Sequence, residues 1–291
     1  MIKEFDWLKY KKIYFAISIT MIVICAYSLI NWGLKLGIEF TGGVEAEYKY
    51  TEEVNLDKLT SKLEEKEIVI SSSQKTKQST YIFKVADLNE EKRVEFKEIM
   101  GENLEEIRFE LVGPSIGPEL VKKTYYAIAI AAGSILLWVA YQFKSVKYGV
   151  SAIAAMLHDT FILIGSFSLL GHFLGAEVDF LFVTAVLTTL SFSVHDTIVV
   201  YDRIREIKKK HGGSVTDIAN RALTETMRRS INNSLTIAFV LASLAIIGGD
   251  TIRWFAAALL IGTILGTYSS PFVAVPLLET WENIAKKRKK E

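Results

Sequence analysis

Six long runs of apolar residues, separated by polar segments, dominate the sequence. They cover residues 13–32, 125–143, 148–170, 180–201, 231–248 and 254–278. Each run carries few or no charged residues, and a helix needs about 20 apolar residues to cross a bilayer. Strands of a membrane β-barrel would alternate polar and apolar positions instead. The pattern therefore predicts an α-helical membrane bundle of six spans.

The polar segment 33–124, between the first and second spans, is long enough for a small domain with its own core. Apolar positions alternate in some stretches, as in strands, and recur at helical spacing in others. The expected strand, helix, strand, strand, helix and strand cover 44–50, 55–67, 68–72, 80–85, 90–104 and 107–112, with a polar turn at 73–79. This order predicts a ferredoxin-like α+β domain.

The charges have a sided distribution, although the net charge is only +1 and the mean hydropathy is +0.26. Lys and Arg concentrate in the N-terminal segment 1–12, the loop 202–230 and the tail 279–291. Because basic residues near span ends stay on the cytoplasmic side, we expect these three segments in the cytoplasm. The domain 33–124 is then extracytoplasmic, and the first span is an uncleaved anchor rather than a signal peptide.

Composition and missing motifs exclude several function classes. The single Cys25 lies within the first apolar run, so no disulfide framework is expected. The acidic excess of 33–124 argues against nucleic-acid binding. The sequence contains no phosphate-binding loop, no Cys/His metal spacing and no G-x-S-x-G nucleophile motif. We therefore expect a protein that is not an enzyme, with no cofactor, no metal and no ATP site.

Two His-Asp pairs stand inside the apolar runs, where a charged side chain costs a few kcal/mol unless it faces protein or water. His158 and Asp159 lie in the third run, and His195 and Asp196 lie in the fourth. Asp196 also continues a polar stripe of residues three and seven positions earlier, which must face other helices or a wet cavity.

Three hypotheses compete for these carboxylates. They could only hydrogen-bond neighbouring helices, or they could relay protons, with Arg229 as a basic partner for Asp196 at the cytoplasmic mouth of span five. An intramembrane aspartyl protease is the third, but no Gly-x-Gly-Asp follows on the next span.

Small residues and proline mark two further features. Gly42, Gly43, Gly113 and Pro114 stand where the domain joins its flanking spans, so they are candidates for hinges or tight turns. In the last span, Gly262 and Gly266 form a G-x-x-x-G face for close helix packing, and Pro271 and Pro276 are expected to kink the helix.

Several segments together resemble a known family. They are Gly37-Ile38-Glu39-Phe40-Thr41-Gly42-Gly43, Val112-Gly113-Pro114-Ser115-Ile116-Gly117, the stretch from Ser193 to Glu206, and the stretch from Leu260 to Ser270. They are similar to the signature segments of the SecF family of protein-export membrane proteins, in the right order and over almost the whole chain.

The resemblance implies a six-span half of a transporter of the resistance-nodulation-division type. Its partners would be SecD, a SecY-type translocation channel, unfolded preproteins and membrane lipid, with the proton-motive force rather than ATP as the energy source. Asp196 falls on the family's span-four Asp, which is implicated in proton passage, and Arg229 falls on its basic residue at the start of span five. His195 stands where the family often has Asn.

Three functions follow as alternatives for this protein of the cell membrane. The first is an accessory subunit of protein export, in which protonation of Asp196 drives motion of the external domain. The second is a proton-coupled exporter of small molecules or lipids from the same superfamily. The third is a structural scaffold of the translocon, in which the charged pairs only join helices.

Overall fold

The computed structural model describes residues 5–50, 55–66, 68, 70–75, 79–85, 90–101, 104–113 and 116–288. The chain divides into two compact units. Residues Leu36–Tyr126 form one, and Met1–Lys35 together with Ala127–Glu291 form the other.

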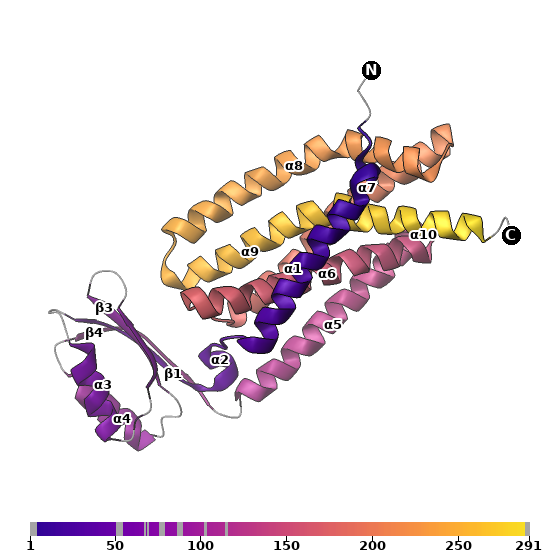
Figure 1. Ribbon diagram of the computed structural model, residues 1–291. Coiled ribbons are helices and arrows are strands. Elements are labelled where there is room, and N and C mark those ends of the chain that lie inside the picture. The colour runs from indigo at the N-terminus through magenta and orange to yellow at the C-terminus, as the bar shows by residue number, and fades with distance from the viewer. Residues whose placement is uncertain are drawn as a thin grey trace. The chain divides into compact units, whose positions relative to one another are not determined.

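The second unit is a helical bundle with six helices long and apolar enough to cross a membrane, counted over the described residues. Its elements are η1 (Trp7–Tyr10), α1 (Lys11–Asn31), α5 (Ile116–Phe143), α6 (Val146–Leu174), α7 (Phe180–His211), α8 (Val215–Ile247), α9 (Asp250–Ser269), the π-helical turn η2 (Ser270–Ala274) and α10 (Val275–Lys287). The last three elements make one continuous span, and Figure 1 shows α8 and α9 side by side. The six-span bundle predicted from the apolar runs is confirmed.

Helices α7 and α8 run well beyond the apolar runs that predicted them. Segment 202–230, expected as the loop between them, is helical except at 212–214. Its charges do not oppose a helix because they pair: Arg203 with Glu225, and Lys210 with Glu206 one turn away. Helix α8 begins where the Ser214 hydroxyl accepts a hydrogen bond from the Asp217 backbone N–H at 3.1 Å.

The last span contains a π-helical turn where the prolines led us to expect a kink. Pro271 lies in this turn, and Pro276 is the second residue of α10. Because proline has no backbone N–H, it interrupts the α-helical hydrogen-bond ladder. The turn widens the helix between Ser269 and Val275, within the most buried of the spans.

The first unit is the predicted ferredoxin-like domain. Its four strands lie in the order β2 (Ile70–Lys75), β3 (Thr80–Val85), β1 (Gly43–Tyr50) and β4 (Leu104–Val112), all antiparallel. Helices α3 (Leu56–Glu65) and α4 (Glu90–Met100) lie against one face of this sheet (Figure 1). The core combines Tyr48 and Phe83 from the sheet with Leu63 and Phe96 from the helices.

Burial changes the pKa of one tyrosine of this core. Tyr50 packs edge-on against Tyr81 at 5.5 Å between ring centroids, and its hydroxyl donates to the Met100 carbonyl at 3.3 Å. Loss of water around the hydroxyl, with a smaller effect of Tyr81, raises the pKa of Tyr50 to about 12.

Several elements of this unit differ from the expectation. Helix α4 ends at Met100 rather than at 104, and strand β4 begins at Leu104 rather than at 107. Strand β2 covers Ile70–Lys75 rather than 68–72, so part of the expected polar turn is strand. Its serines have weak strand propensity, but β3 supplies a full antiparallel partner and tertiary pairing overrides propensity. A short helix, α2 (Ile38–Thr41), was not predicted because a four-residue helix has no periodic signal.

Close approach of α1 and α6 depends on a glycine. A Cβ atom on Gly165 would lie 2.2 Å from the Cβ of Cys25 and 2.9 Å from its Cα. One turn farther along α1 and near by on α6, the Ser28 hydroxyl donates to Ser168 at 2.7 Å. Hydroxyl pairs of this kind join helices whose backbones are close.

We expect Gly165→Ala to destabilise the bundle by roughly 1–3 kcal/mol, because the added methyl group would have to displace backbone atoms of α1. Thermal unfolding of the purified chain in detergent measures the effect. Gly133→Ala is the matched control, since a Cβ on Gly133 meets no atom within 4 Å. Equal melting temperatures for the two variants would contradict the close packing.

Candidate functional site

A deeply buried carboxylate of the bundle is that of Asp159, in the middle of α6. Its side chain accepts hydrogen bonds from the hydroxyl of Ser193 on α7 at 2.7 Å and of Ser269 on α9 at 2.5 Å, both at Oδ2. Its other oxygen lies 2.9 Å from Nδ1 of His158. Asp159 is 5% exposed and His158 is 8% exposed. One carboxylate thus joins three helices that are far apart in the sequence.

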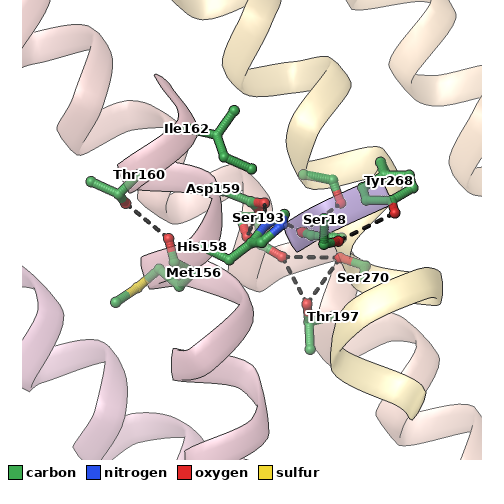
Figure 2. A network of polar contacts seen from close by, with 12 residues as sticks. Ser18, Met156, His158, Asp159, Thr160, Ile162, Ser193, Thr197, Tyr268 and Ser270 are labelled. Carbon is green, nitrogen blue, oxygen red and sulfur yellow. Dashed lines mark hydrogen bonds and ion pairs between the residues drawn. The ribbon is translucent and has the colours of Figure 1, made fainter. Parts of the chain in front are cut away.

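A second layer of hydroxyl groups continues from this carboxylate (Figure 2). Thr197 and Ser270 lie 2.9 Å apart through their hydroxyl oxygens, and each also donates to the Ser193 carbonyl. The Tyr268 hydroxyl donates to the Tyr14 carbonyl at 2.8 Å, which connects the last span to α1. The interior of the bundle is therefore a polar network rather than an apolar core at this level.

Asp196 has a more open environment, one turn along α7 from Ser193. Its carboxylate is half-buried and accepts a hydrogen bond from the Ser230 hydroxyl on α8 at 3.0 Å. It lines a cavity of about 280 Å³ between α7, α8 and α9, together with His195, Ser234 and Thr267. The Thr267 hydroxyl donates to Ser234 at 2.7 Å across this cavity. Asp196 is therefore placed to reach water or a mobile group, which Asp159 is not.

Glycines on α9 allow α7 to come close enough for these contacts. A Cβ on Gly262 would lie 2.0 Å from Cγ2 of Thr189, and one on Gly266 would lie 3.1 Å from the Ser193 Cα. A larger residue at Gly262 would push α9 away from α7, the helix that carries Ser193 and Asp196.

The predicted site residues fall into separate groups. His158 and Asp159 belong to the buried network, whereas His195 is exposed on the wall of the Asp196 cavity. Arg229, the residue before Ser230, is exposed. Among the described residues no ion pair joins Arg229 to Asp196, which is bonded by Ser230 instead. Its role as a basic partner stays a prediction.

The four junction residues have mixed geometry. Gly42 and Gly43 have φ angles of +75° and +126°, which only glycine adopts readily. Gly113 follows the last strand, and Pro114 lies outside the described residues. The backbone thus explains the glycine pair as a tight turn, and its use as a hinge stays a prediction.

Sequence reasoning missed two donors of the site, Ser230 and Ser269. Ser230 is the residue next to the predicted Arg229, and it rather than the arginine contacts Asp196. A hydroxyl at the edge of an apolar run is a weak signal, because such residues also bond to their own helix backbone. No three His, Cys, Asp or Glu side chains of the described part are grouped to hold a metal ion.

Comparison with known proteins identifies the family of the chain. The family described as "Protein export membrane protein SecD/SecF, C-terminal" matches residues 92–284, and the "SecD/SecF GG Motif" matches residues 27–54. The chain belongs to the SecD/SecF family. It is a multi-pass membrane protein of the cell membrane.

Curated relatives cover nearly all of the chain. "Protein translocase subunit SecF" of Thermobaculum terrenum is 38% identical, over 96% of this chain and 94% of the relative. The protein of the same name from Anaerolinea thermophila is 34% identical, over 93% of this chain and 92% of the relative.

Solved structures of SecDF share the fold. A crystal structure of SecDF from Thermus thermophilus, described as a translocon-associated membrane protein, superposes with a TM-score of 0.83 at 32% identity. The superposition covers 96% of this chain but only 39% of the longer SecDF chain. A second SecDF structure, in a "Super-membrane-facing form", gives a TM-score of 0.73 at 31% identity and covers all of this chain and 40% of its own.

We expect Asp159→Ala to lower the free energy of unfolding by roughly 3 kcal/mol, because it leaves two buried serine hydroxyls and His158 without their acceptor. Denaturant unfolding in detergent measures the loss. Asp217→Ala is the control, since the Asp217 side chain is exposed. A loss no greater than that of the control would show that Asp159 does not hold the bundle together.

Proposed function

We propose that the chain is the SecF-type subunit of a complex with SecD that assists Sec-dependent protein export. In this proposal the proton-motive force acts on the membrane bundle, and the domain built on the β1–β4 sheet acts on emerging preproteins outside the membrane. The names of the relatives and the SecDF structures support the family role. The half-buried Asp196 at an open cavity is the observation that supports proton coupling.

The environment of Asp196 fits a group whose charge changes during a cycle. An ionised carboxylate in a low-dielectric bundle makes its hydrogen bond from Ser230 stronger, because one partner is charged. Protonation removes the charge and weakens this connection between α7 and α8. Proton binding and release would therefore alternate the packing of α8, which buries only 6% of its apolar window within this chain.

The surface of the bundle is consistent with a membrane partner. The described residues leave the cavity beside Asp196 open, and α8 exposes Phe239, Ile246 and Ile247 by 68%, 78% and 80%. A related half such as SecD would close the cavity and cover this face. Relatives that carry both names in one chain support such a pairing.

The domain has an edge that suits an extended polypeptide. Strand β4 is at the edge of the sheet, and its Ile107 and Leu111 are each 50% exposed. An edge strand offers backbone groups to any unfolded chain, without regard to sequence. This supports a role in holding preproteins on the extracytoplasmic side, where the distribution of basic residues leads us to expect the domain.

We expect Asp196→Asn to reduce gradient-dependent export to the level seen without a proton gradient, while the complex with SecD still assembles. The amide keeps the hydrogen bond from Ser230 but cannot carry the charge. Preprotein uptake into vesicles containing the full complex, with and without a protonophore, measures the effect. Asp217→Asn serves as the control, and normal gradient-dependent export by Asp196→Asn would refute proton coupling and favour the scaffold.

A photoreactive residue at Ile107 is expected to crosslink to a preprotein stalled in translocation, because this edge is the proposed contact. The same probe at Lys209, an exposed position at the end of α7, should give no product. Crosslinks are detected on gels with a labelled preprotein. An exporter of small molecules or lipids would give no product at either position.

A further inference from the structure

An open apolar groove lies between α1, α6 and α10, away from both aspartates. Its volume is about 350 Å³, and its lining is Phe15, Val150, Ser151, Ala154, Leu277, Thr280, Trp281 and Ile284. We call it the α1–α6–α10 groove. Trp281 is 37% exposed and Ile284 is 50% exposed, so the groove opens to the outside of the bundle.

Each helix of the groove carries a basic residue about one turn from the lining, toward the same end of the bundle. Lys12 precedes Phe15 by three residues, Lys147 precedes Val150 by three, and Arg288 follows Ile284 by four. Residues three or four apart share a helix face, so each cation lies about one turn beyond the lining, and Lys12 also borders a separate hollow on α1.

The helix directions place these basic residues together. Helices α1 and α6 are parallel, because Cys25 contacts Ile162 and Ser28 contacts Ser168. The start of α1 meets α10 through an ion pair of 2.9 Å between Lys11 and Glu279. The first turns of α1 and α6 therefore lie at the end of the bundle toward which α10 runs.

These three cations have no counter-charge in the described part of the chain, where Lys12, Lys147 and Arg288 make no ion pair. The acidic residues of α10 are used elsewhere. Glu279 is 3% exposed and bonds Lys11, and Glu282 pairs with Lys208 at 3.3 Å. The mouth of the groove is thus positive and its floor is apolar.

We propose that the α1–α6–α10 groove binds one anionic phospholipid. The acyl chain lies along the floor formed by Val150, Ala154 and Ile284, and the headgroup phosphate lies among the three cations. Trp281 lines the groove next to Ile284, and tryptophan side chains concentrate at the level of the headgroups. Basic pockets between membrane helices at the cytoplasmic side are known to select anionic headgroups, and an apolar floor alone would select none.

The test uses the full-length chain in mild detergent and native mass spectrometry. The probes are phosphatidylglycerol and phosphatidylcholine with identical acyl chains. We expect phosphatidylglycerol to be retained preferentially, and Lys12→Gln or Lys147→Gln to weaken its binding roughly fivefold each, the equivalent of about 1 kcal/mol per basic residue. Binding of phosphatidylcholine should not change in these variants.

Two further variants distinguish lipid binding in the groove from general electrostatic attraction of the lipid to the protein surface. Lys209→Gln removes an exposed charge elsewhere and should leave phosphatidylglycerol binding unchanged. Ala154→Trp fills the floor of the groove and should reduce retention of this lipid while all three cations remain. If this variant does not fold, the two lysine variants test the proposal by themselves. Inorganic phosphate should not displace the lipid.

Several results would overturn the proposal. Equal retention of the two lipids, or equal effects of Lys12→Gln, Lys147→Gln and Lys209→Gln, would show no selective site. Displacement by inorganic phosphate would indicate a simple anion site. A dimer that Ala154→Trp dissociates would show that a second copy of the chain covers the groove. None of these outcomes depends on proton coupling at Asp196.

Discussion

The bundle depends on the burial of one carboxylate, Asp159, among hydroxyl groups of other helices. A charge away from water is tolerated only if hydrogen bonds replace its hydration. Here Ser193 and Ser269 supply those bonds from α7 and α9, so the positions of both helices relative to α6 are set together. The glycines of the last span follow from this requirement, because serine hydroxyls reach the carboxylate only when the helix backbones are close.

The two aspartates have different surroundings. Asp159 has several donors and almost no exposed surface, which suits a fixed structural connection. Asp196 has one side-chain donor, Ser230, and a cavity beside it, which suits a reversible connection. Because Ser193 lies one turn from Asp196 on the same helix, a change at the second site acts directly beside the first. With a fixed contact at Asp159 and a weaker one at Asp196, α7 can shift at its Asp196 side while the bundle stays folded.

Much of the fold could be predicted because it depends on periodicity. Solid apolar runs predicted the spans, and a short run rich in strand-favouring residues predicted β3 over the residues it occupies, Thr80–Val85. The start of β2 was misplaced because its strand state depends on pairing with β3, which local propensity does not record. In the site, Ser193 was accessible to prediction since it lies on the stripe of Asp196. Ser269 was not, because it meets Asp159 across 110 positions of sequence.

The π-helical turn η2 has a consequence for how the last span tolerates insertions and deletions. A π turn is equivalent to one extra residue in an α-helix, and each residue turns an α-helix by about 100°. Upstream of η2 the span presents Gly262 and Gly266 to α7 and Ser269 to Asp159 on α6. Downstream it presents Glu279 to Lys11. Removing one residue here would restore regular helix and rotate one half against the other. The turn therefore determines how the packed face of α9 is rotated about the helix axis relative to the packed face of α10.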